Sequence, residues 1–139
     1  MISADRADRL RVAGLRWHPR SGDRFVIRRA GLDDEVYTIS DMMIEPHQFS
    51  TGTVLGFNGT TEWALDSVAQ EDALWLPGED QLRELLGGTF RRLARSSEGY
   101  EVVIELAGRA QQVFTASAAA DAYADALLAL VGAAVDRQD

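Results

Sequence analysis

Three side chains with metal-ligand chemistry lie close together between residues 41 and 47. This segment reads Asp-Met-Met-Ile-Glu-Pro-His. In an extended chain, side chains of like parity share a face, so Asp41, Glu45 and His47 would project together. Two carboxylates and an imidazole can bind a divalent metal or orient a water for hydrolysis. Pro46 is expected to end the strand, however, and acids beside a turn are more often simply solvated.

Tryptophans offer a second set of binding groups. Trp17, Trp63 and Trp75 could line a ligand pocket, because aromatic side chains are frequent in such cavities. Large aromatic side chains more often fill the interior of a domain, since each buries a large apolar area. We therefore expect the tryptophans to belong to the core.

The composition excludes several kinds of catalytic centre. The chain of 139 residues contains no cysteine and no lysine, and its 14 basic residues are all arginines. Thiolate chemistry, Schiff-base chemistry and a P-loop lysine are thereby excluded. Neither a glycine-rich phosphate loop nor a G-x-S-x-G nucleophile motif occurs. The sequence predicts no catalytic residue and no cofactor-binding residue, and we expect no bound cofactor.

Charge is divided unevenly along the chain. The net charge of −8 argues against nucleic-acid binding, which needs a basic surface. Residues 1–30 hold eight arginines and three aspartates, a net charge of +5, whereas residues 31–139 carry −13. We expect the basic segment to dock on the acidic remainder of its own chain or of a partner subunit. The alternative is an anion-binding interaction patch made by four of its arginines. These are Arg16, Arg20, Arg28 and Arg29.

The hydrophobic pattern predicts an α+β fold that must position all these side chains. Ser3 is suited to cap a helix over residues 4–13, and Gly14 to end it. Short β-prone runs follow at 24–28, 35–40 and 42–45. From residue 79 the pattern predicts α-β-β-β-α. Its first helix buries a stripe of Leu82, Leu85 and Leu86 and ends at Gly87-Gly88. Its strands occupy 89–95, 100–106 and 110–115, and a C-terminal helix packs on the sheet. The alternative is a first helix that continues to Arg95, because Phe90 and Leu93 also keep the helical spacing.

An antiparallel β-meander around an Asn-Gly hairpin is expected between the two helical parts. Asn58 and Gly59 both tolerate positive φ, which suits a type I′ turn between two strands. The chain length fits a single α+β domain over residues 1–139. Within this domain the pattern allows two sub-units, which are a helix plus β-meander at 1–76 and the α-β-β-β-α pattern at 77–139.

The predicted C-terminal helix carries one apolar residue outside its buried stripe. Leu130 and Val131 belong to the stripe, and Asp121 and Asp125 lie on the opposite face. Leu128 falls near the acidic side, where it is a candidate subunit contact.

Three segments carry a resemblance to a known group. They are Trp17–Phe25 (WHPRSGDRF), Gly56–Leu65 (GFNGTTEWAL) and Leu74–Leu86 (LWLPGEDQLRELL). Through them the chain resembles, over nearly its full length, small actinobacterial proteins that carry the label "pilus assembly protein CpaE". CpaE proteins proper are P-loop ATPases, whereas this chain has neither a Walker motif nor a doubly wound βαβ pattern. The resemblance therefore carries over no catalytic residue and implies a partner or accessory of a pilus or secretion system.

We accordingly expect a non-enzymatic protein that works by contact with a protein partner or with a second copy of itself. The alternative is a small-molecule-binding protein or a metal-assisted hydrolase that uses the face of Asp41, Glu45 and His47. No apolar run approaches the ~18 residues that a membrane helix needs, and the chain opens on no signal-type segment. We therefore expect a cytoplasmic protein with no membrane insertion.

Overall fold

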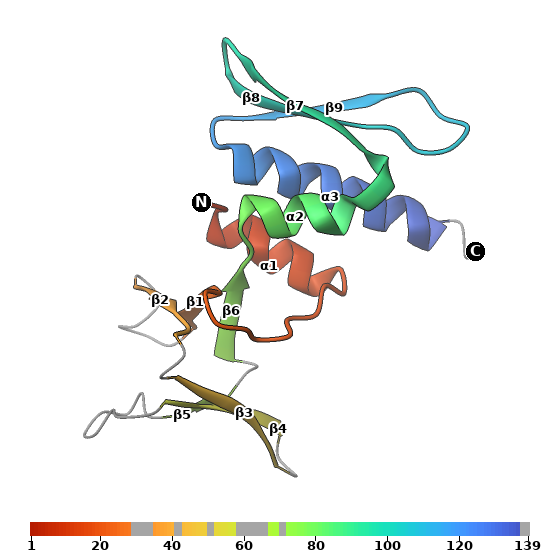
Figure 1. The fold of residues 1–139 in the computed structure, drawn as a ribbon. Coiled ribbons are helices and arrows are strands. Elements are labelled where there is room, and N and C mark those ends of the chain that lie inside the picture. The colour runs from red at the N-terminus through yellow and green to blue at the C-terminus, as the bar shows by residue number, and fades with distance from the viewer. Residues whose placement is uncertain (29–34, 41–42, 50–51, 58–66, 70–71, 137–139) are drawn as a thin grey trace. The chain divides into compact units, whose positions relative to one another are not determined.

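The computed structural model describes residues 1–28, 35–40, 43–49, 52–57, 67–69 and 72–136 (Figure 1). Helices and antiparallel strands combine in it, which confirms the α+β fold class. In chain order the elements are α1 (Ala4–Val12), β1 (Arg24–Ile27), β2 (Val36–Thr38), β3 (Met43–Phe49), β4 (Gly52–Phe57), β5 (Ser67–Ala69), β6 (Ala73–Leu76), α2 (Glu79–Leu86), β7 (Phe90–Ser96), β8 (Gly99–Ile104), β9 (Gln112–Ala116) and α3 (Ala119–Asp136).

Two compact units divide the chain. Met1–Leu15 and Pro77–Asp139 form the first unit, and Arg16–Leu76 forms the second. The boundary after residue 76 is the one expected from the sequence. The N-terminal helix, which the sequence grouped with the β-meander, belongs instead with the C-terminal half. The reason is that α1 packs on α3 within the first unit and is joined to it by ion pairs.

Helix α1 begins and ends where its capping residues predict. The hydroxyl oxygen of Ser3 accepts a hydrogen bond from the backbone N–H of Arg6 at 3.2 Å, as an N-cap should. Asp5 and Arg9 form an i,i+4 ion pair at 3.0 Å. Gly14 has a φ of +113°, and the helix ends at the residues before it.

Helix α2 stops at the paired glycines, and a strand follows. At its start, the side-chain oxygen of Gln81 accepts a hydrogen bond from the backbone N–H of Gly78 at 2.8 Å. At its end, Gly87 adopts a φ of +57°, and Gly87–Thr89 form a single 3-10 turn. Strand β7 then begins at Phe90, which confirms a strand rather than a continued helix in this segment.

Strands β7, β8 and β9 form an antiparallel sheet with β8 in the centre. Ser96 pairs with Gly99 across a two-residue turn, as predicted for this hairpin. Gly99 has a φ of +131°, and a Cβ there would lie 2.7 Å from the Cα of Ser117 and would also collide with the carbonyl oxygen of Ala116. Only glycine therefore lets the end of β9 pass so close to β8.

One face of this sheet is covered by α3, as the sequence predicts (Figure 1). The rings of Phe90 and Tyr123 lie 5.7 Å apart between centroids, which places Phe90 on the covered face. Phe90 pairs with Ile104, and Ile104 with Gln112, so these residues share that face. Val113 is the next residue after Gln112 and lies on the opposite, open face.

The core of the first unit joins all three of its helices to the sheet. Leu10, Leu82, Leu86, Val102, Ile104 and Tyr123 are at most 2% exposed. Each buried leucine contributes about 1.5–3 kcal/mol relative to an exposed one. The stripe that the sequence assigned to α2 therefore forms the interior, apart from Leu85, which is exposed.

In the second unit, β1 lies between β2 and β6. Phe25 and Ile27 lie on one face of β1, and Val26 lies on the other. All three side chains are buried, so both faces of β1 are covered. Phe25 and Ile27 pack in one cluster with partly buried Trp17 and Tyr37 against it.

The expectation that Pro46 ends a strand is wrong. Strand β3 runs from Met43 to Phe49, so Pro46 lies within it and does not end it. The sheet has the order β3-β4-β5, which makes β3 an edge strand. Proline is tolerated in an edge strand because one side of that strand needs no ladder hydrogen bond. The pairing with β4 also shifts register between Met43 and Pro46, as at a β-bulge.

On the side away from β3, strand β4 pairs with the short strand β5. Gly56 pairs with Ser67, and Leu55 with Val68. A two-residue turn at Asn58-Gly59 would instead pair Gly56 with Thr61. The turn itself, with Trp63, lies outside the described residues.

Candidate functional site

The predicted metal site requires Asp41, Glu45 and His47 to lie on one face of a regular strand. Strand β3 has a register shift in this segment. Glu45 and His47 lie on β3, and Asp41 lies outside the described residues. Beyond a register shift of one residue, the odd-numbered side chains move to the face that the even-numbered ones held before it. The parity rule that grouped the three residues therefore does not hold across the shift between Met43 and Pro46. Among the described side chains, no three histidine or carboxylate groups converge as a metal would require.

An aromatic cluster occupies the second unit, where the sequence expected core filling. The rings of Trp17 and Trp75 are nearly parallel, with an interplanar angle of 9° and centroids 6.5 Å apart. Phe25 lies 5.5 Å from Trp17 and 5.6 Å from Tyr37 between centroids. Trp17 and Trp75 thus contribute to the interior of this unit, as predicted, although both remain partly exposed.

The two indole N–H groups of this cluster differ in their surroundings. Trp17 donates to the carboxylate of Asp23 at 2.9 Å. The same carboxylate oxygen accepts from the backbone N–H of Arg20 at 3.0 Å, and Asp23 is only 5% exposed. The Nε1 of Trp75 is buried and has no hydrogen-bond partner among the described residues. An unpartnered buried donor is costly, so Trp75 Nε1 is the polar group here that a ligand acceptor would satisfy.

The arginines of the predicted anion patch are distributed around β1. Arg16 and Arg20 precede the strand and Arg28 follows it, and all three are exposed. The four residues of β1 separate Arg20 from Arg28 by about 13 Å along the strand. Arg29 lies outside the described residues. The backbone geometry therefore places the described arginines at both ends of a strand rather than in one loop.

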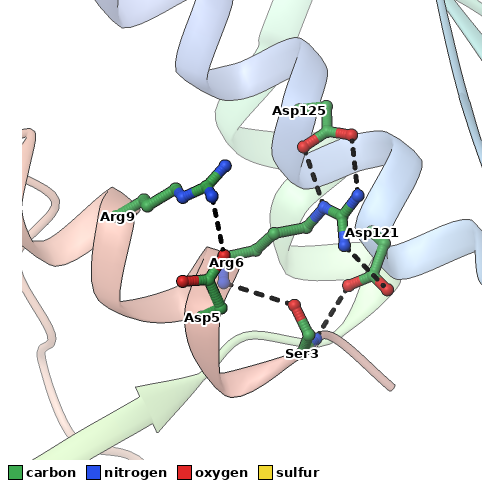
Figure 2. A network of polar contacts seen from close by, with 6 residues as sticks. All are labelled: Ser3, Asp5, Arg6, Arg9, Asp121 and Asp125. Carbon is green, nitrogen blue, oxygen red and sulfur yellow. Dashed lines mark hydrogen bonds and ion pairs between the residues drawn. The ribbon is translucent and has the colours of Figure 1, made fainter.

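A polar network joins α1 to the first turns of α3 (Figure 2). Arg6 forms a bidentate ion pair with Asp125, at 2.9 Å from Nε to Oδ1 and 3.3 Å from Nη2 to Oδ2. Its Nη1 lies 3.4 Å from Asp121, which also accepts from the backbone N–H of Ser3 at 2.7 Å. The hydrogen bond to Asp125 raises the pKa of Arg6, against an opposing effect of burial. This confirms, for Arg6, that the basic N-terminal segment docks on acidic residues of its own chain.

Leu128 belongs to the helix face that α1 occupies. Asp121, Asp125 and Leu128 follow one another at intervals of four and three residues, so they share a face of α3. Arg6 binds the first two, and Leu128 is half-buried. A subunit contact through Leu128 stays a prediction.

Strand β9 forms one edge of the sheet in the first unit. Within the described residues, β9 pairs with β8 on one side and with no strand on the other. Its sequence, Gln-Val-Phe-Thr-Ala, carries no charge, and Val113 is 54% exposed. An edge strand presents unpaired N–H and C=O groups to any strand that approaches. We call residues 112–116, with this free side, the β9 edge.

No family model, curated protein or solved structure matches this chain. Among the helices of the described ranges, none has both the length and the apolar character that crossing a membrane requires.

The β9 edge was not singled out from the sequence, although two signals were present. Strand β7, the other edge of this sheet, contains Arg91, Arg92 and Arg95, whereas β9 contains no charged residue. Which strands form the edges depends on pairing order, and the sequence does not determine that order by periodicity alone. The difference in charge between β7 and β9 indicates which strand can pair with another chain only when both strands are known to be edges.

Proposed function

We propose that this protein is an interaction module that binds a protein partner by adding a strand to its sheet at the β9 edge. The observation that carries the proposal is that β9 carries no charge and, among the described strands, pairs on one side alone in a sheet packed on α3. Strand addition uses main-chain hydrogen bonds for affinity and alternate side chains for specificity. Val113 on the open face and Phe114 on the face toward α3 would be the two specificity positions.

The resemblance to proteins labelled "pilus assembly protein CpaE" supports a role as an accessory of a pilus or secretion system. Such accessories act by contact, which fits the absence of lysine and cysteine nucleophiles from the whole sequence. The proposal requires no cofactor and no nucleic acid.

A photo-crosslinking amino acid in place of Val113 tests the proposal. We expect it to link a short extended segment of one protein, identified by mass spectrometry of the crosslinked peptide. The matched control is the same amino acid in place of Val12, a 72%-exposed valine near the end of α1. Equal crosslinking patterns from the two positions would contradict strand addition at β9.

The buried Nε1 atom of Trp75 favours a second candidate function, the binding of a small aromatic molecule. Trp17 provides a parallel stacking surface, and Trp75 Nε1 provides a donor without a partner among the described residues. A panel of aromatic fragments that carry a hydrogen-bond acceptor can be screened by saturation-transfer NMR. Trp75→Phe retains a ring but removes the donor, so it should abolish any specific binding. Fragments that bind wild type and variant alike would exclude this candidate.

A further inference from the structure

Among the strands that the structure describes, β7 and β9 are the two edges of the sheet β7-β8-β9, and they differ in their protection against pairing with another chain. Strand β7 has a register shift between Phe90 and Arg92, and three arginines lie along it. Bulges and charged side chains are the usual means by which edge strands avoid pairing with another chain. Arg91 also reaches the backbone oxygen of Gly88 at 2.6 Å, beside the start of the strand. Strand β9 has neither feature.

The uncharged strand β6 is an edge of the sheet in the second unit, but its side chains differ from those of β9. Ala73, Leu74 and Leu76 are at most 5% exposed, so β6 lies inside its unit. Val113 and Thr115 of β9 are exposed, and the other side chains of β9 are half-buried. Strand β2, the other edge of the sheet that contains β6, is also uncharged and largely exposed, but it has three residues where β9 has five. Among the edge strands whose side chains are described, β9 is therefore the longest that is both uncharged and accessible.

We propose that the strand which adds to the β9 edge is β9 of a second copy, giving a two-fold dimer with one continuous six-stranded sheet. This inference rests on the proposed function and names its partner. A two-fold axis relates identical strands in antiparallel order, so the interface must be self-complementary. With the axis at Phe114, its ring faces its own copy, Val113 faces Thr115, and Gln112 faces Ala116.

Self-pairing at this edge brings no like charges together. All three kinds of cross-strand pair in the proposed register are uncharged, although each chain carries a net charge of −8. An equivalent two-fold pairing of β7 about Leu93 would place Arg91 opposite Arg95 of the other copy. Like charges directly opposite each other destabilise a sheet. The charge pattern therefore favours β9 with β9 over β7 with β7.

The proposed register also places apolar groups next to one another on both faces. Phe114 lies on the face toward α3 and is half-buried, so a second Phe114 across the axis would cover its exposed part. Aromatic cross-strand pairs are among the more stabilising ones. On the open face, Val113 would lie between Thr115 of the other copy and its own neighbour in β8, Val103. The contacts with the other copy would cover the exposed parts of Phe114 and Val113.

Sedimentation equilibrium of the full chain over a range of concentrations tests the inference. We expect a reversible monomer–dimer equilibrium for the wild type. Val113→Lys places two ammonium groups diagonally across the axis and should raise the dimer dissociation constant by roughly tenfold or more. The control Val12→Lys introduces the same charge at another exposed valine, far from β9 in the sequence, and should leave the constant unchanged. A chain that is monomeric at every concentration, or equal effects of the two variants, would overturn the inference.

The register is tested separately by disulfide trapping, which the absence of cysteine from the chain makes clean. Residues directly opposite each other in an antiparallel pair have Cα atoms about 4.5–5.5 Å apart, within the range of a disulfide. Phe114→Cys should oxidise rapidly to a covalent dimer, and Val12→Cys should not. Equal oxidation rates would contradict the two-fold axis at this residue.

The outcomes separate this inference from the proposed function. A monomeric chain whose crosslinker at position 113 still links a foreign extended segment overturns the dimer and retains strand addition. A monomeric chain with no position-specific crosslink overturns both.

Discussion

Arg6 on α1 and Asp125 on α3 form a bidentate ion pair, with N–O distances of 2.9 and 3.3 Å, between residues 119 positions apart in sequence. Asp121 lies 3.4 Å from the same guanidinium group. The pair fixes the N-terminal helix to the C-terminal one, so residues 1–15 fold with residues 77–139 rather than with the segment that follows them.

Removing this arginine should destabilise the first unit. Arg6→Gln leaves Asp121 and Asp125 without their common cation, and both carboxylates are largely shielded from water. We expect a loss of about 1–2 kcal/mol in the free energy of unfolding, measured by urea denaturation. Arg9→Gln is the control, because the Arg9–Asp5 pair is mostly exposed and should contribute almost nothing. Equal losses for the two variants would contradict a structural role specific to Arg6.

Gly99 should tolerate no side chain. Gly99→Ala introduces a Cβ that meets the carbonyl oxygen of Ala116 and the Cα of Ser117, at a φ of +131°. We expect a loss of more than about 2 kcal/mol in the free energy of unfolding. At Gly132 in α3, a Cβ would meet nothing within 4 Å, so Gly132→Ala should stabilise by about 0.5–1 kcal/mol. Thermal denaturation of both variants checks the opposite signs.

Alkaline pH should destabilise the first unit through Tyr123. Burial raises the pKa of Tyr123 above its ordinary value, and the charge of Arg83 acts in the opposite direction. A folded-state pKa above the unfolded one means that stability is fully present below about pH 10 and is lost as the pH rises further. Tyr123→Phe should remove this decline. An identical alkaline decline in the free energy of unfolding of both proteins would contradict the assignment to Tyr123.

Asp23 should be required for the aromatic cluster of the second unit. Its carboxylate accepts from Trp17 Nε1 and from the backbone of Arg20 while nearly buried. Asp23→Ala leaves both donors without this acceptor, which should cost about 1–3 kcal/mol and redshift the tryptophan fluorescence. Asp23→Asn keeps an acceptor oxygen and should lose less. Unchanged stability in Asp23→Ala would show that the contact is dispensable.

Local signals in the sequence predicted much of the first unit, and long-range pairing accounts for what they missed. Ser3, Gly14 and Gly87 mark helix ends through interactions within a few residues, so capping and turn rules suffice there. The assignment of α1 to the C-terminal half depends on Arg6 meeting Asp125, a contact that periodicity does not encode.

The same limit explains the corrections in the second unit and the omission at the candidate site. Whether Pro46 ends a strand depends on whether β3 is an edge, and whether 41, 45 and 47 share a face depends on a bulge. The exposure of β9 likewise follows from the strand order. The sequence shows that β9 carries no charge, but it does not show that β9 is an edge strand.

Amide hydrogen exchange along β9, compared between dilute and concentrated protein, tests the central claim most directly. In an isolated edge strand, the outward amides exchange rapidly because they have no ladder partner. If a second β9 adds at this edge, the outward amides among residues 112–116 should become protected with rising concentration, while those of β7 stay unchanged. Exchange at β9 that is independent of concentration, or protection confined to β7, would contradict the account.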